Sequence, residues 1–165
     1  ASRFFTTEEY NALWSCFNLR QYLQRTSTTL SSVPADIASP LLCDMIESVD
    51  SVVARKGNTI VTAKLRFGHA ETLMPLLSLM RLKGCYYKTN YFDTVGPNWQ
   101  DFNVVPMSAK LQMVLFKTAK GNFYLRIDRN EVPVPFIPGS NEIYVPWETA
   151  REYLSNCVPL YYQTW

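Results

Sequence analysis

The chain has 165 residues and a net charge of +2 at pH 7; 47% of its residues are apolar and 18% are charged. This composition excludes a disordered chain, and the length suits one domain rather than two. The low charge, with basic residues scattered along the sequence, argues against nucleic-acid binding, and no apolar run reaches the roughly 18 residues of a membrane span.

Residues 1–57 are predicted to be helical. Thr6 and Glu9 match a capping box, in which each side chain bonds the other residue's backbone N–H, and the helix is expected to run to about Arg25. Apolar residues recur at the spacing of one helix face, at Tyr10, Leu13, Trp14 and Phe17. A Ser/Thr-rich loop is predicted from 26 to 39.

The second predicted helix begins with Ser39 as its cap and Pro40 at its first position, and Gly57 ends it. Its apolar stripe comprises Leu42, Met45, Ile46, Val49, Val52 and Val53. Each of these two helices therefore has an apolar face that we expect to be buried against another part of the fold.

Residues 58–82 are predicted to form a strand, a turn and a helix. Apolar and polar residues alternate over Thr59–Phe67, which is typical of a strand with one buried face. A short helix follows, with Leu73, Leu76, Leu77 and Met80 on one side. Pro75 fits that helix only in its first turn, because proline has no N–H to donate.

The second half of the chain is predicted to be mainly β structure. Residues 86–103 have no clear period and contain Gly96-Pro97, which indicates a surface excursion. Late β strands are expected within 104–136: a hairpin of Ser108–Thr118 and Phe123–Asp128 joined at 119–122, then a turn at Arg129-Asn130 into Val132–Phe136. A Pro-rich loop, 133–146, leads into a terminal helix over 146–157. This order predicts an α/β or α+β chain with a mixed sheet, formed as a single unit over 1–165.

The strongest candidate for a functional site is the predicted turn Gly68–Glu71, which holds the only histidine of the chain, His69. The N–H groups at a helix start are unpaired and favour an anion, and the side chains of His69 and Glu71 are spaced to line one cavity beside them. Two alternatives stay open: a structural histidine, and a glutamate that only stabilises the helix dipole.

The cysteines lie far apart and form no Cys-x-x-Cys pair; they are Cys16, Cys43, Cys85 and Cys157. Metal binding is not expected from this spacing, and no cofactor is predicted. Buried free thiols are the favoured interpretation, with one or two disulfides as the alternative in an exported protein.

The segment Leu65–Met80, LRFGHAETLMPLLSLM, resembles the corresponding segment of the multiple inositol polyphosphate phosphatases, a clade of the histidine acid phosphatases. Most of that branch has His-Asp at this point, whereas this clade has His-Ala-Glu, as here at His69-Ala70-Glu71. Two later stretches, Ser108–Leu115 and Tyr124–Pro133, resemble the family's late hairpin with its Asn-Glu turn. The resemblance covers most of the chain.

The resemblance implies the C-terminal part of a histidine phosphatase-like α/β domain, with a mixed sheet and flanking helices. It also implies hydrolysis of inositol polyphosphates, such as inositol hexakisphosphate, through a phosphohistidine intermediate. Glu71 would be the proton donor, and His69 would hold the phosphoryl oxygens together with the N–H groups of Ala70 and Glu71. Arg66 is a further candidate for binding a substrate phosphate, or else a solvated strand residue.

The family's nucleophilic histidine lies in an Arg-His-Gly-x-Arg-x-Pro motif that this chain does not contain. We therefore expect the chain alone to be inactive and to need the N-terminal segment of such an enzyme as its partner. Without a central strand, two strand edges and the apolar faces of covering helices would be exposed, so aggregation is expected. The alternative function is a non-catalytic module that binds a phosphate ligand or a protein. By family, the location is the periplasm, the secretory pathway or outside the cell.

Overall fold

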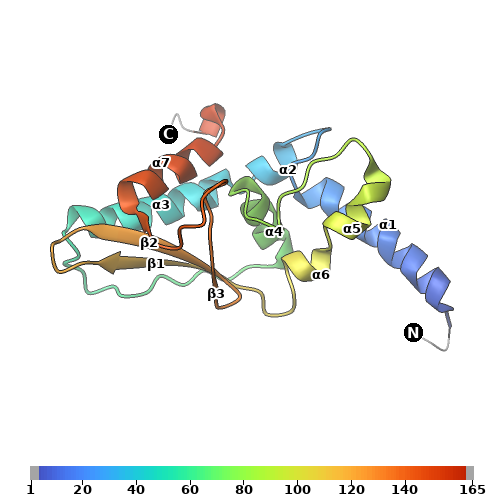
Figure 1. The fold of residues 1–165 in the computed structure, drawn as a ribbon, viewed down its shortest axis with the longest axis horizontal. Helices are drawn as coiled ribbons and strands as arrows, with labels where there is room; N and C mark the ends of the chain where they lie inside the picture. Colours follow the sequence, from blue (N-terminus) through green and yellow to red (C-terminus); the bar gives the residue numbers. More distant parts are fainter. Residues whose placement is uncertain (1–3, 163–165) are drawn as a thin grey trace.

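The computed structural model describes residues 4–162 (Figure 1). Its helices are α1 (Thr7–Arg25), α2 (Val33–Asp36), α3 (Ser39–Ala54), α4 (Ala70–Leu79), α5 (Val95–Asn98), α6 (Asp101–Val104) and α7 (Trp147–Cys157), with 3₁₀ turns at Phe92–Thr94 and Leu160–Tyr162. Its strands are β1 (Leu111–Lys117), β2 (Phe123–Arg129), β3 (Val132–Val134) and β4 (Val145–Pro146). α4 lies in the middle, with the sheet, α3 and α7 to one side and α1, α5 and α6 to the other. In the part of the chain described, no helix is both long and apolar enough to cross a membrane.

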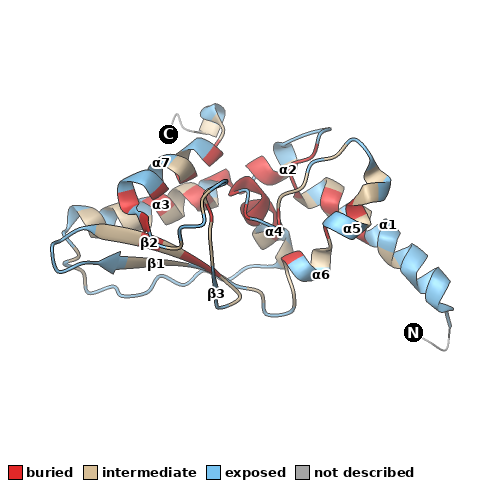
Figure 2. Ribbon diagram, viewed as in Figure 1, coloured by how far each residue is buried: buried red, intermediate tan, exposed pale blue. Residues whose placement is uncertain are grey.

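α1 begins and ends where the sequence predicts. The capping box is confirmed, because Thr6 Oγ1 accepts the Glu9 N–H at 3.2 Å and Glu9 Oε2 accepts the Thr6 N–H at 2.8 Å. The predicted burial of the apolar stripe is wrong for three of its four residues, because Tyr10, Leu13 and Phe17 are exposed. Only Trp14 of the stripe is partly buried, against Phe102, and the buried residues of α1 lie on its second half (Figure 2).

The predicted loop between the first two long helices contains a further short helix, α2, so that part of the prediction is wrong. Pro34 at the start of α2 explains the difference, because a proline is already in helical backbone geometry there. α3 matches the second predicted helix, although Ala38 rather than Ser39 occupies the cap position. Gly57 ends it as predicted: it has φ +79° and donates its N–H to the Val52 carbonyl at 2.9 Å.

The predicted strand at 59–67 does not form. Residues 60–69 are exposed throughout, with Ile60 99% and Phe67 93% exposed, and no strand among residues 4–162 pairs with them. These residues instead run as open chain from the end of α3 to the start of α4 (Figure 1). We call residues 59–69 the open segment. A strand needs a hydrogen-bonded neighbour, so the alternating pattern alone is not sufficient to form one.

α4 is the most deeply buried helix of the molecule, with every residue from Met74 to Leu79 buried. After its partly exposed first turn it is apolar except for Ser78, which is typical of a helix enclosed by other elements. It begins earlier than predicted, at Ala70, so Pro75 is its sixth residue and not part of its first turn. Because proline has no N–H, the Glu71 carbonyl loses the hydrogen bond it would otherwise accept from position 75.

The sheet is antiparallel throughout the described residues, with β2 pairing β1 along one edge and β3 and β4 along the other. The α/β content is as predicted, but the mixed sheet is not, because the segment at 59–67 does not join it. The predicted hairpin and third strand are confirmed, with β1 starting at Leu111 rather than Ser108. The tight turn before β3 uses Asn130 and Glu131, both with positive φ. β4 lies within the predicted Pro-rich loop.

α7 forms as predicted and packs against α3 and β2, so these two helices form one layer on the sheet (Figure 1). A single carboxylate on α3 joins the two helices: Asp50 accepts the Trp147 indole N–H at 3.0 Å and the Arg151 Nε–H at 2.8 Å. Trp147 is buried, which fixes the start of α7 against the sheet layer.

Residues 86–103 are not the surface excursion that the sequence predicts. They contain α5, part of α6 and the fully buried Trp99, whose ring lies 5.6 Å from the ring of Tyr22 on α1. Asn18, also buried, joins this region to α1: its Nδ2 donates to the Trp99 carbonyl at 2.9 Å and its Oδ1 accepts the Asp101 N–H at 2.8 Å. This buried amide fixes α1 beside α5 and α6.

Replacing Asn18 with alanine is expected to lower the free energy of unfolding by about 2 kcal/mol or more, because two backbone groups lose their partners inside the protein. Urea unfolding followed by tryptophan fluorescence measures this. Asn11→Ala, at an exposed position of the same helix, is the matched control and should change stability by less than about 0.5 kcal/mol. Equal effects of the two substitutions would contradict the role given to Asn18.

Candidate functional site

His69 lies at the boundary between the open segment and α4. It is the N-cap residue, with extended backbone at φ −97° and ψ 172°, and its carbonyl accepts the N–H groups of Thr72 at 3.0 Å and Leu73 at 3.2 Å. Its imidazole makes no capping hydrogen bond and the residue is exposed. The ring is therefore open to solvent and to a ligand.

Glu71 is the second residue of α4 and is also exposed. The N–H groups of Ala70 and Glu71 have no acceptor within the helix, because the residues four positions earlier precede it. The helix dipole adds partial positive charge at the same place. α4 begins at Ala70, earlier than the sequence predicts, and its start brings an imidazole, a carboxylate and two amides without an acceptor inside the helix to one helix end. The catalytic roles of these groups stay predictions.

Arg66, the third candidate, is bound to α3. Its Nε donates to Asp44 Oδ2 at 2.7 Å and its Nη2 to Ser48 Oγ at 2.9 Å. Lys64 reaches the same pair, with its Nζ 3.0 Å from Asp44 Oδ1 and 2.9 Å from Ser48 Oγ. We call these four residues the Asp44 clamp. A substrate phosphate at Arg66 would have to compete with Asp44 for the guanidinium.

The clamp sets how the open segment approaches α4. Hydrogen bonds from Lys64 and Arg66 hold the pKa of the Asp44 carboxyl below its ordinary value of 3.8. A lowered pKa contributes stability that is present above 3.8 and lost as the pH falls through the folded-state pKa. Both partners are partly exposed, so this contribution is small. The main effect of the clamp is therefore to hold the chain just before His69 against α3.

The sequence pattern does not identify Asp44 and Ser48 as partners of this segment. Their spacing of four residues places them on one face of α3, and Lys64 and Arg66 lie on one side of an extended chain because they are two positions apart. These local spacings are readable from the sequence. Their meeting depends on the reversal of the chain after α3, which brings the open segment back along that helix.

The cysteines are all unpaired in this structure. Cys85 and Cys157 are buried, and burial raises the pKa of both thiols, whereas Cys16 is exposed and Cys43 is partly buried. The favoured interpretation of buried free thiols therefore holds for two of the four. Among residues 4–162, no three His, Cys, Asp or Glu side chains are grouped so that they would hold a metal ion.

Removal of the clamp carboxylate is expected to free the open segment. In Asp44→Ala, trypsin should cleave after Lys64 and Arg66 several-fold faster than in the unchanged chain, because both side chains lose their main partner. Mass spectrometry of a digestion time course measures the rates. Asp93→Ala removes an exposed carboxylate that has no ion pair within the described residues, and its rates should be unchanged. Equal rates in Asp44→Ala and the unchanged chain would contradict the clamp.

Comparison with known proteins gives the resemblance independent support. The chain is 29% identical over 175 aligned positions to "Multiple inositol polyphosphate phosphatase 1" of Gallus gallus, covering 93% of this chain and 37% of that protein. The Homo sapiens protein of the same name is 29% identical over 147 positions, which cover 79% of this chain and 29% of that protein. The Dictyostelium discoideum protein is 31% identical over 93 positions, which cover 53% and 14%. No family model matches the chain.

These similarities confirm the predicted resemblance, at the level of distant homology. The chain spans between 14% and 37% of the length of these curated relatives, so it corresponds to only part of such a protein. The exposed His69 and Glu71 lie in the His-Ala-Glu motif that this chain shares with the family. We conclude that the chain is a distant relative of the multiple inositol polyphosphate phosphatases.

Proposed function

We propose that this chain forms the proton-donor half of a phosphatase site that hydrolyses phosphate monoesters of inositol polyphosphates. The observation that carries the proposal is the placement of His69 and Glu71 together at the exposed start of α4, beside two unpaired backbone N–H groups. The names of the three curated relatives support the substrate class.

In the proposed reaction, a histidine outside this chain's sequence attacks phosphorus, and the bond from phosphorus to the inositol oxygen breaks. The protonated Glu71 gives its proton to the departing alkoxide, which leaves as an alcohol. His69 and the N–H groups of Ala70 and Glu71 bind the phosphoryl oxygens and stabilise the charge that develops on them. Water then attacks the phosphohistidine, releases phosphate and restores the histidine.

The open segment supports the need for a second half of the site. Residues 59–67 alternate apolar and polar side chains as a strand does, yet their backbone has no strand partner within residues 4–162. We infer that a strand from the remainder of the phosphatase pairs with this segment. Because the segment ends at His69, the same pairing would bring the nucleophilic histidine close to α4.

The second candidate function is a non-catalytic module that binds another protein. Exposed apolar side chains favour it, and among them are several just before and along α1 and on the open segment: Phe4, Phe5, Tyr10, Leu13, Phe17, Ile60, Val61, Leu65 and Phe67. Both functions need a polypeptide partner. They differ in whether Glu71 has a role in chemistry.

The purified 165-residue chain is expected to release no phosphate from inositol hexakisphosphate, because its only histidine is assigned to phosphate binding and not to attack. A phosphate-release assay tests this, with an acid-quench and mass measurement to search for a phosphorylated histidine. Turnover by the isolated chain, abolished in His69→Ala, would contradict the half-site.

When the chain is joined to the nucleophile-bearing part of the Gallus gallus relative, Glu71→Gln is expected to lower kcat for inositol hexakisphosphate by about 10²-fold or more. The loss for p-nitrophenyl phosphate should be much smaller, because p-nitrophenolate leaves without needing a proton. Glu8→Gln is the matched control, since Glu8 is the exposed second residue of α1 as Glu71 is of α4.

Comparing the loss of activity on the two substrates distinguishes a catalytic role of Glu71 from a structural one. A Glu71 that only stabilises the helix start would lower both activities equally, and that result would contradict the proton-donor role. If Glu71→Gln lowers neither activity while the assembly forms normally, the binding module is the better account.

A further inference from the structure

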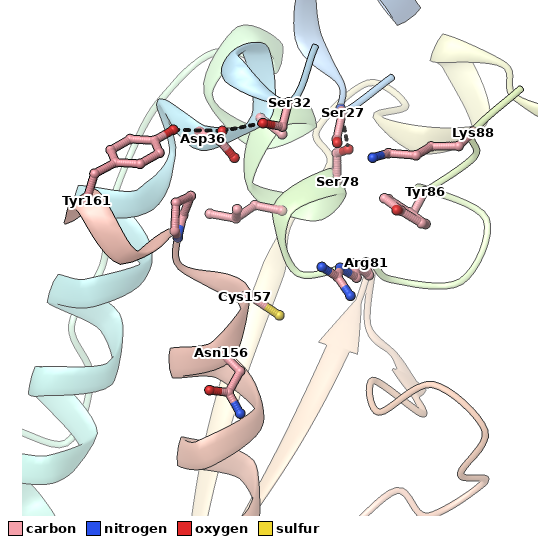
Figure 3. Close-up of a pocket in the computed structure, with 13 residues that line it drawn as sticks. Ser27, Ser32, Asp36, Ser78, Arg81, Tyr86, Lys88, Asn156, Cys157 and Tyr161 are labelled. Carbon is pink, nitrogen blue, oxygen red and sulfur yellow. Dashed lines mark hydrogen bonds between the residues drawn. The ribbon is translucent and has the colours of Figure 1, made fainter. Parts of the chain in front are cut away.

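A cavity of about 250 Å³ lies at the end of α4 remote from His69. Its walls come from α2 and the segment just before it, the last residues of α4, the chain 81–88 that follows, and the C-terminal end of α7 with residues 159–161 (Figure 3). About eight water molecules would fill this volume, which suits a small ligand.

Two cations line the cavity. Arg81 Cζ lies 5.9 Å and Lys88 Nζ 6.0 Å from the centre of the Tyr86 ring, so both cations lie near the same aromatic side chain of the cavity wall. Neither cation has a carboxylate partner within ion-pair distance among the described residues. Figure 3 shows the ammonium of Lys88 directed toward Ser27 and Ser78.

Hydroxyl groups line the same wall. Ser78 is buried and its Oγ accepts the Ser27 N–H at 3.0 Å, so the group that Ser78 can still offer is its own O–H donor. Asn156 adds an amide at the rim. Two cations and neutral donors around one small space are the groups that recognise a phosphate.

The one carboxylate of the cavity is held at its other end. Asp36 Oδ2 accepts hydrogen bonds from Ser32 Oγ at 2.7 Å and from Tyr161 Oη at 2.8 Å (Figure 3). The hydrogen bond to Asp36 is the main cause that raises the pKa of Tyr161 to about 12. Asp36 therefore anchors the last described turn on α2, and the cations at the opposite end stay unpaired.

The backbone of Arg81 places this residue immediately after the C-terminal end of α4. Arg81 has φ +53°, in the left-handed region, where glycine is the usual residue after a helix. The Leu82 N–H donates to the Leu77 carbonyl at 3.2 Å, which is the long bond of such a helix end. Lys56 has the same conformation, with φ +54°, just after α3, so the backbone at Arg81 is one of two such helix ends among residues 4–162; what distinguishes Arg81 is that its side chain lines the cavity.

We propose that this cavity binds a small ligand through its phosphate group, with Arg81 and Lys88 holding the phosphate oxygens and Ser78 donating a hydrogen bond. The ligand is free phosphate or a small phosphate monoester. The site is separate from the His69 turn, which lies at the other end of a ten-residue helix. It does not depend on phosphatase activity.

Titration calorimetry of the full 165-residue chain with inorganic phosphate, and in parallel with glycerol 3-phosphate, tests the site. Arg81→Gly is expected to weaken binding about tenfold or more, since it removes a charged, bidentate donor. The same variant should be at least as stable to urea as the unchanged chain, because glycine relieves the left-handed backbone. Lys120→Gln, an exposed cation in the hairpin turn outside the cavity, is the matched control and should bind within twofold of the unchanged chain.

Tighter binding of glycerol 3-phosphate would identify the ligand as a monoester, and tighter binding of inorganic phosphate would identify the free ion; either supports the site. Full affinity in Arg81→Gly, or no saturable binding of both probes at millimolar concentration, would overturn it. If His69→Ala abolishes binding and Arg81→Gly does not, the phosphate belongs to the His69 turn and the cavity proposal is wrong.

Discussion

The structure depends most on how residues 60–69 are held, because this alternating segment pairs with no strand within residues 4–162. Over residues 60–69 the chain exposes both its backbone and its large side chains, and within residues 4–162 it is held from the side by the Asp44 clamp on α3. The clamp fixes the direction from which the chain enters α4, and so fixes His69 at the helix start. An exposed strand-like segment of this kind is a template for pairing with another strand.

The features that the sequence predicts correctly are those that residues close together in the chain determine. The capping box at Thr6 and Glu9, the stop at Gly57, and the hairpin between β1 and β2 each depend on one short continuous stretch of the chain. The incorrect predictions concern which other parts of the protein pack against or pair with a given segment. The alternation at 59–67 leads to a strand only if a second strand pairs with it. In the same way, the apolar face of α1 at Tyr10 and Leu13 is exposed, because no described element covers it.

The candidate site also combines local features that the sequence predicts with long-range contacts that it does not predict. The sequence places His69 and Glu71 at a helix start, and α4 begins there. It does not predict that Asp44 binds Arg66, because that contact joins residues 22 positions apart through a reversal of the chain. Nor does it predict the cavity beside Arg81, whose walls come from distant segments. In both cases the residue types are visible in the sequence, and their meeting is a property of the fold.

Amide hydrogen exchange of residues 59–67 tests the central claim most directly. The segment contains no proline, so every residue in it has a backbone N–H whose exchange can be measured. In the isolated chain we predict fast exchange along the whole segment. When the chain is joined to the rest of a curated relative, exchange at alternate amides of the segment should slow by about a hundredfold or more, because a strand paired along one edge accepts every second N–H. Exchange that stays as fast in the joined protein as in the isolated chain would contradict the account of this chain as one half of a phosphatase site.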